Sequence, residues 1–326
     1  MINSLIIALI GFVVAALCGI FMIPLLHRLK FGQEIREEGP KWHKSKSGTP
    51  TMGGFIFIVA LIVAVAAGIF ICGIADDADS IKGIVVITLA ALGFGAVGFI
   101  DDYIKVILKR NLGLKAGQKF ALQCLVAVLF SVWLISDGII NTEIKIPFTG
   151  LNPVPLPYFV YIPFIVVVML AAVNSVNLTD GLDGLATCIT LVVCVFYCII
   201  SNITASVPIV IFSSALLGSL VGFLLYNKFP AKVFMGDTGS LFLGGAVAAM
   251  AIYMKNPLLL LVVGFVYVAE ALSVIIQVTW FKKTGKRIFK MSPIHHHFEM
   301  CGWSEVKIVV VFSLVTALLC MVGYLA

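Results

Sequence analysis

Five aspartates stand where long apolar runs of this sequence end or begin: Asp101, Asp102, Asp180, Asp183 and Asp237. Carboxylates in such positions bind divalent cations, transfer protons or attack electrophiles. Polar groups this close to hydrocarbon usually face a cavity or one another, and they mark function more often than accident. When the chain is threaded through a bilayer, all five emerge on one face. We therefore expect them to form one active site.

Asp101 and Asp102 belong to the motif F-I-D-D-Y-I-K, at the C-terminal end of a predicted helix. The helix macrodipole disfavours negative charge there by about 0.3–1 kcal/mol, so the pair needs a compensating cation. Lys105 and Lys109 follow Asp101 at i+4 and i+8 and share its face if the helix continues. The alternative interpretation is a solvated helix end with an intrahelical ion pair.

Asn174, Asn177 and Asp180 lie in N-S-V-N-L-T-D-G-L-D-G-L-A and step by three along the last turns of a predicted helix. Residues at this spacing face roughly the same way. Asp183, in the same motif, opens the next span and could instead cap free backbone amides. A functional role is therefore better supported for Asp180 than for Asp183.

Asp237 begins another span in F-M-G-D-T-G-S-L. A helix N-terminus followed by Thr238 and Ser240 offers hydrogen-bond donors suited to phosphate. The alternative is a simple helix cap. Phe234, just upstream, could stack on a planar base, although an aromatic side chain at a membrane edge also serves as an anchor.

Three consecutive histidines, His295, His296 and His297, lie in M-S-P-I-H-H-H-F-E-M. Consecutive side chains point in different directions on a helix or a strand, so the three make a poor tridentate metal site. Histidine titrates near neutrality and donates two hydrogen bonds when protonated, which suits phosphate binding or proton transfer.

Two further segments have an unusual polar content for their place in the chain. S-K-S-G-T-P-T-M-G-G combines Lys46 and Thr51 with glycines that allow close backbone approach, although it could be only a helix start. Glu270 stands inside an apolar span, where an unpaired charge costs several kcal/mol. We expect a helix break, a partner or protonation at Glu270.

The elements that must position these residues are membrane spans. The sequence is 61% hydrophobic and 12% charged, with a mean hydropathy of +1.13, whereas soluble domains carry roughly a quarter charged residues. Its apolar runs are about 20 residues long and apolar on all faces, which predicts helices and excludes a β-barrel. We predict an all-α integral membrane protein, a single domain over 1–326, with ten spans near 3–26, 51–75, 83–100, 119–136, 158–176, 184–200, 207–226, 239–254, 257–281 and 306–325.

The distribution of lysine and arginine predicts the orientation. With the N-terminus outside, the inner loops hold 18 of the 22 basic residues, and such residues are retained on the cytoplasmic side. Both termini should therefore face outward, and the aspartates should lie on the cytoplasmic face.

Together these residues predict a site for Mg²⁺ and a diphosphate, with a lipid reaching the site from the bilayer. Magnesium prefers oxygen ligands, usually one or two carboxylates plus substrate phosphates. Zinc fits less well, because the sequence has no usable spacing of histidine and cysteine. We expect no nucleic-acid partner.

The motifs also carry a resemblance, ordered along nearly the whole chain. The S-K-S-G-T-P-T-M-G-G, F-I-D-D-Y-I-K, N-S-V-N-L-T-D-G-L-D-G-L-A, F-M-G-D-T-G-S-L and P-I-H-H-H-F-E segments resemble those of the polyprenyl-phosphate N-acetylhexosamine-1-phosphate transferases. The triple histidine and the T-P-T-M-G-G segment resemble the branch of bacterial phospho-N-acetylmuramoyl-pentapeptide-transferases. That family has ten helices, forms homodimers and has a ninth helix that breaks and bends into the membrane.

The resemblance implies transfer of phospho-MurNAc-pentapeptide from UDP-MurNAc-pentapeptide to undecaprenyl phosphate at the bacterial inner membrane, giving lipid I and UMP. It implies Asp237 as the chief Mg²⁺ ligand, with Asp101 as a second ligand, and Asp101, Asp102 and His296 in the chemistry. The expected substrate-binding residues are Lys46, Thr51, Lys105, Asn174, Asn177, Asp180, Asp183, Asn227, Phe234, Gln277, His295 and His297.

Several alternatives stay open at the level of sequence. Either Asp101 or Asp102 could act as a base, and a phospho-aspartyl intermediate is also compatible with the motifs. A sister transferase could use UDP-N-acetylglucosamine on the same lipid. An ion-coupled transporter would need charges near the midplane, where only Glu270 lies. A structural scaffold gives no reason for aspartates so close to hydrocarbon.

Overall fold

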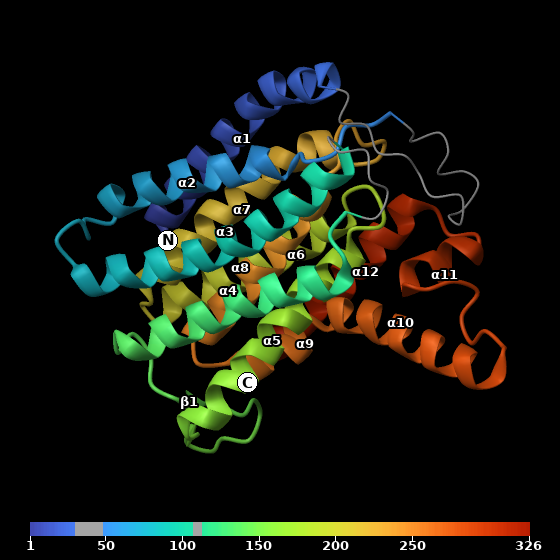
Figure 1. Ribbon diagram of the computed structural model, residues 1–326. Helices are drawn as coiled ribbons and strands as arrows, with labels where there is room; N and C mark the ends of the chain where they lie inside the picture. Colours follow the sequence, from blue (N-terminus) through green and yellow to red (C-terminus); the bar gives the residue numbers. More distant parts are fainter. Residues whose placement is uncertain (30–47, 107–112) are drawn as a thin grey trace.

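Long apolar helices make up most of the computed structural model, which describes residues 1–29, 48–106 and 113–326 (Figure 1). They run side by side as a bundle, so the prediction of an all-α membrane protein is confirmed. The helices of spanning length are α1 (Ile2–Arg28), α2 (Gly54–Ile71), α3 (Ala78–Val106), α4 (Ala116–Ser136), α5 (Tyr158–Thr179), α6 (Leu185–Ile203), α7 (Val207–Asn227), α8 (Gly236–Tyr253), α10 (Phe265–Thr284) and α12 (Glu305–Gly323).

Nine helices in the described part of the chain are long and apolar enough to cross a membrane, and α8 is the one expected span outside that set. Its first turn carries Asp237, Thr238 and Ser240, which lower its apolar character. Nearly all of α8 is buried within the bundle (Figure 1), so it needs little lipid-facing surface. The count of ten spans stays a prediction.

The ninth expected span, 257–281, is interrupted as predicted. It consists of a 3-10 turn η2 (Pro257–Leu259), the single-turn helix α9 (Leu260–Val263) and then α10. Gly264 separates α9 from α10, and its N–H still donates to the Leu260 carbonyl at 2.9 Å. Beyond this point α10 extends away from the bundle (Figure 1).

Three neighbouring helices approach the backbone of α8 through small residues. A Cβ placed on Gly98 of α3 would lie 2.0 Å from the Asp237 carbonyl oxygen. A Cβ placed on Gly54 of α2 would lie 2.5 Å from the Gly239 Cα of α8. On α8 itself, a Cβ placed on Gly244 would lie 2.4 Å from the Val173 Cα of α5. Small residues at helix interfaces let backbones pack closely in membranes, where apolar burial alone gives little attraction.

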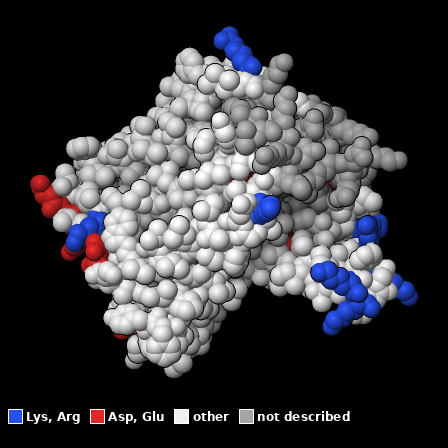
Figure 2. Space-filling view, in the orientation of Figure 1, with Lys and Arg blue, Asp and Glu red and all other residues white. Residues whose placement is uncertain are grey.

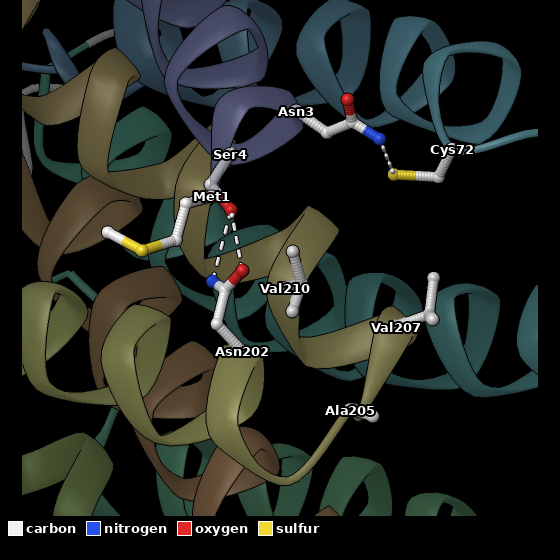
Figure 3. Close-up of a pocket in the computed structure, with 8 residues that line it drawn as sticks. All are labelled: Met1, Asn3, Ser4, Cys72, Asn202, Ala205, Val207 and Val210. Atoms are coloured by element: carbon white, nitrogen blue, oxygen red, sulfur yellow. Dashed lines mark hydrogen bonds between the residues drawn. The ribbon is translucent and has the colours of Figure 1, made fainter.

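The two termini lie at one end of the bundle (Figure 1). Figure 3 shows how the start of α1 is held there: Asn202 of α6 donates to the Ser4 hydroxyl at 3.0 Å, and Asn3 contacts Cys72 Sγ at 3.9 Å. The Ala326 carbonyl accepts from Lys145 Nζ at 2.9 Å, beside a short ribbon of β1 (Glu143–Ile144) and β2 (Val154–Pro155). That the termini face outward stays a prediction.

Charges are distributed unevenly between the two ends of the molecule, although basic side chains are also visible beside the acidic ones (Figure 2). Lysine and arginine side chains gather over the far end of α10, where Lys282, Lys283, Lys286 and Arg287 are exposed, while acidic side chains are visible at the opposite end. The basic residues and the predicted site thus share one end. This arrangement fits the cytoplasmic orientation that the sequence predicts.

We predict that Gly98→Ala lowers the melting temperature of the purified protein, because the added Cβ has to displace the first turn of α8. Overpacking of this kind typically costs about 1–3 kcal/mol. Gly117→Ala on α4 is the matched control, since a Cβ there meets no atom of the described residues within 4 Å. Thermal unfolding in one detergent would measure both, and equal melting temperatures for Gly98→Ala and the wild type would contradict the packing described above.

Candidate active site

Asp102 lies four residues before the end of α3 and caps the N-terminus of α8. Its Oδ2 accepts from the Thr238 N–H at 2.8 Å and from the Thr238 hydroxyl at 2.7 Å, and its Oδ1 accepts from the Asp237 N–H at 3.2 Å. Free N–H groups of a helix start require partners, and a carboxylate is the strongest available. The unfavourable position of Asp102 at the end of α3 is therefore compensated by the start of α8.

Asp101 and Asp237 share two lysine ammonium groups. Lys105 Nζ lies 2.5 Å from Asp101 Oδ2 and 2.9 Å from Asp237 Oδ2. Lys119 Nζ, from the first turn of α4, lies 2.7 Å from Asp237 Oδ2 and 3.6 Å from Asp101 Oδ2. The second oxygen of Asp101 accepts from the Leu114 N–H at 2.7 Å. The ion pair of Asp101 with Lys105 confirms the predicted i, i+4 contact, whereas Lys109 lies outside the described residues.

The end of α5 reaches the same cluster. Asn177 Nδ2 donates to Asp237 Oδ1 at 3.3 Å. Asp180 follows the last residue of α5, and among the described residues its carboxylate has no hydrogen-bond partner. Burial raises the pKa of Asp180 well above its usual value, and the negative charges of Asp237, Asp102 and Asp183 add to the shift. Asn177 and the five aspartates thus lie together at one end of the bundle, as predicted.

Asp183 is buried and ties neighbouring segments to the turn between α5 and α6. Its Oδ2 accepts from the Ala231 N–H at 2.9 Å, and its own N–H donates to Glu305 Oε2 at 3.4 Å. Its carboxylate therefore holds a backbone amide of the segment after α7, and the sequence-based alternative of a cap on α6 stays open. Its predicted contact with substrate stays a prediction.

Thr51 and Phe234 lie on two segments that pair beside the cap of α8. The Phe234 N–H donates to the Pro50 carbonyl at 2.8 Å, and the Gly53 N–H donates to the Phe234 carbonyl at 2.8 Å. Gly236 has φ +71°, and a Cβ there would lie 2.6 Å from Asp102 Oδ2 and 2.8 Å from Thr51 Oγ1. Only glycine fits this position. Lys46, predicted to bind substrate from the same segment, lies outside the described residues.

Three predicted substrate-binding residues form hydrogen bonds within the protein. Asn174 Nδ2 donates to Gln123 Oε1 on α4 at 2.9 Å. Asn227 accepts from the Thr187 hydroxyl at 2.7 Å and donates to the Val233 carbonyl at 3.0 Å. Gln277 Oε1 accepts from the N–H groups of Ile288 and Phe289, both at 3.0 Å, and its Nε2 donates to the Phe289 carbonyl at 3.0 Å. The Asn174 bond joins α5 to α4, the Asn227 bonds hold the segment after α7, and the Gln277 bonds hold the segment after α10.

The histidines lie on α11 (Ile294–Met300), and the three rings have different surroundings, as predicted for consecutive residues. His295 is fully buried and its Nδ1 lies 3.1 Å from Glu270 Oε2. His296 Nδ1 lies 2.6 Å from Glu299 Oε2. His297 Nδ1 accepts from the Lys290 N–H at 3.1 Å. Glu270 therefore has both a nearby helix break and a partner, two of the outcomes that the sequence predicted.

Lys119 and Thr238 are the main site residues that sequence reasoning missed. Thr238 was considered only as a phosphate donor, whereas it binds Asp102. Lys119 had one available signal, because it is a lysine in the first turn of the fourth predicted span, on the same membrane face as the aspartates. Its contact with Asp237, however, depends on the start of α4 lying beside the start of α8, which spacing alone does not reveal.

The arrangement of Asp101 and Asp237 suits a divalent cation. Their Oδ2 atoms converge on the same lysine Nζ atoms, so both oxygens face one small volume. No group of three histidine, cysteine, aspartate or glutamate side chains in the described ranges has metal-binding geometry. Two carboxylates completed by substrate phosphates and water are the usual ligand set of Mg²⁺, so these residues fit that ion better than zinc.

Comparison with known proteins identifies the family of the chain. The profile of Glycosyl transferase family 4 matches residues 84–255, which include Asp101, Asp180 and Asp237. Similar proteins named phospho-N-acetylmuramoyl-pentapeptide-transferase occur in Clostridium beijerinckii (52% identical, covering 100% of this chain and 98% of the relative), Clostridium botulinum strain Eklund 17B (51%, 98% and 94%) and Acetivibrio thermocellus (49%, 98% and 93%). With half of its residues identical over its full length, the chain belongs to the phospho-N-acetylmuramoyl-pentapeptide-transferases.

Proposed function

We infer that this protein transfers phospho-MurNAc-pentapeptide from UDP-MurNAc-pentapeptide to undecaprenyl phosphate, releasing UMP and forming lipid I for peptidoglycan synthesis. The membership of the family supports this reaction. The protein is a multi-pass protein of the bacterial inner membrane. We further propose that the site faces the cytoplasm and that the chain forms a homodimer, as the resemblance of its motifs implies.

One observation carries the proposal: Asp101 and Asp237 share the ammonium groups of Lys105 and Lys119 at one end of an apolar bundle. The lysines can bind phosphate oxygens, and the carboxylates can bind a cation. A reaction between a lipid phosphate and a nucleotide diphosphate needs both functions in one place beside the bilayer.

The charges of this cluster argue for a cation that accompanies the substrate. Among the described residues the charges of the two lysines and the two aspartates cancel, so a bound diphosphate would add negative charge that these residues do not compensate. Mg²⁺ held by Asp237 and Asp101 would neutralise the diphosphate and stabilise the charge that develops as the bond to UMP breaks.

The chemistry is a displacement at phosphorus. An oxygen of the lipid phosphate forms a bond to the β-phosphorus of the sugar nucleotide, the bond from that phosphorus to the bridging oxygen breaks, and UMP leaves with the electron pair. A phosphate monoester loses its second proton with a pKa of about 6, so the acceptor is mostly deprotonated near pH 7. Lys105 and Lys119 can orient the phosphates once substrate draws them from the aspartates.

The roles of the adjacent aspartates differ in this proposal. Asp102 is the weaker candidate for a base, because both of its oxygens accept hydrogen bonds from the start of α8. Asp101 has one oxygen on the Leu114 amide and the other on the lysines, which substrate can displace. Inversion at the transferred phosphorus would exclude a phospho-aspartyl intermediate, and retention would exclude a direct displacement.

The choice of sugar nucleotide tests the proposed reaction against that of the sister transferase. We predict UMP release from UDP-MurNAc-pentapeptide only when both undecaprenyl phosphate and Mg²⁺ are present. UDP-N-acetylglucosamine should give little release under the same conditions. UMP would be measured by chromatography in four reactions: the complete mixture, the mixture without undecaprenyl phosphate, the mixture without Mg²⁺, and the mixture with UDP-N-acetylglucosamine as the donor. Faster release from UDP-N-acetylglucosamine would assign the chain to the other reaction.

We predict that Asp237→Asn lowers kcat by roughly a hundredfold or more, because the substitution removes a cation ligand and the counter-charge of two lysines. The melting temperature and the Mg²⁺ dependence of UMP release should be measured together. Asp137→Asn, at the other end of the bundle, is the control and should retain activity. Near-normal turnover of Asp237→Asn at saturating Mg²⁺ would remove this residue from the proposed ligand set.

Lys119 lies outside the sequence motifs, and its contact with Asp237 predicts a role in substrate binding. Lys119→Met should lower kcat/KM about 10- to 100-fold, since one of two cations that face the diphosphate is lost. Lys115→Met is the matched control, because Lys115 is exposed at the N-cap of the same helix, four residues earlier, and forms no ion pair with the described residues. If the two variants have equal kcat/KM, Lys119 does not act on the substrate.

A further inference from the structure

Glu270 and His295 form a buried pair between α10 and α11. Their side chains are 0% and 1% exposed. Glu270 Oε2 lies 3.1 Å from His295 Nδ1 and also accepts from the His295 backbone N–H at 3.4 Å. A glutamate inside an apolar helix requires such a partner. His295 supplies two contacts to the same oxygen, one from its ring and one from its backbone.

This contact determines which ring nitrogen carries a proton. Glu270 Oε2 already accepts from the backbone of His295, so it presents lone pairs to this edge of the ring, and Nδ1 is the nitrogen that donates. Nε2 lies on the opposite edge. It is buried and forms no hydrogen bond with any described residue.

The Nε2 edge of His295 packs on the turn between α5 and α6. A Cβ placed on Gly181 would lie 2.3 Å from His295 Nε2 and 2.6 Å from its Cε1. Gly181 directly follows Asp180 and has no positive φ, so the ring alone explains why a side chain does not fit there. His295 thus connects the bent ninth span to the turn that carries Asp180.

We propose that Glu270 and His295 form a positioning pair for the transfer reaction: Glu270 holds the His295 ring through Nδ1, and the ring supports the turn that carries Asp180 through its contact with Gly181. The part that concerns turnover rests on the proposed function. The pair differs from the role that the sequence suggested for His295, namely direct contact with the diphosphate. Its full burial on the turn is the observation that separates the two roles.

Two substitutions distinguish positioning from direct chemistry. The amide nitrogen of asparagine can occupy the place of Nδ1 and donate to Glu270, whereas that of glutamine extends toward the place of Nε2. We expect each substitution to lower kcat about 10- to 100-fold, because His295→Asn loses the ring atoms that meet Gly181 and His295→Gln loses the donor to Glu270. If His295→Gln, which keeps a nitrogen near the place of Nε2, has the kcat of the wild type while His295→Asn does not, Nε2 itself acts in the reaction and the proposal fails.

A double-mutant cycle tests the contact with the turn. Gly181→Ala should lower kcat in the wild-type background, because its Cβ meets the ring atoms Nε2 and Cε1. The same change should cost at least tenfold less in the His295→Asn background, which lacks both atoms. Equal costs in the two backgrounds would overturn the proposed contact. Ser273→Ala is a buried control on α10. Among the described residues the Ser273 hydroxyl donates to the Glu270 carbonyl alone, so its removal should leave kcat unchanged.

The proton on Nδ1 can be tested without any assay of activity. Nitrogen-15 spectra of histidine-labelled protein should show His295 protonated on Nδ1, with the signal assigned by its loss in His295→Asn. A neutral His295 that is protonated on Nε2 alone would overturn the role of Glu270, even if the variants failed to fold. Because this result does not depend on UMP release, a wild-type protein inactive with UDP-MurNAc-pentapeptide would contradict the proposed function and leave the pair standing.

Discussion

The hydrogen bonds of Asp102 to the first turn of α8 are the contact on which the site depends. The end of α3 and the start of α8 carry opposite partial charges, and neither end has bulk water on all sides to satisfy its free groups. The carboxylate resolves both problems. Because Asp101 precedes Asp102 and Asp237 lies in the capped turn, the same bonds that close the helix also bring Asp101 and Asp237 to one pair of lysines.

Close packing of α8 explains why this junction can hold carboxylates accurately. Apolar side chains gain little by leaving lipid for another helix, so helices in a bilayer associate through close van der Waals contact. Gly98, Gly54 and Gly244 allow three neighbours to reach backbone distance from α8. A helix fixed on three sides is a rigid base for Asp237, and rigid support is what a site that binds charged groups requires.

The features that the sequence predicted are those fixed by the bilayer or by local geometry. A hydrocarbon core demands long apolar helices, which predicted the fold and placed the aspartates on one face. The break at Gly264 and a partner for Glu270 followed from the cost of a buried charge. Sequence could not assign different roles to Asp101 and Asp102, because neighbouring residues point in different directions and their partners lie on α4 and α8.

The high pKa of Asp180 reflects its burial and the carboxylates around it. Burial raises the pKa first, and Asp237, Asp102 and Asp183 then add to it although Lys105 and Lys119 bind Asp237 nearby. These three carboxylates therefore disfavour a further negative charge at the turn after α5. A diphosphate that approached this turn alone would be repelled, whereas a diphosphate that carries a divalent cation would be attracted. Each would then strengthen the binding of the other, since coupling between two ligands is reciprocal.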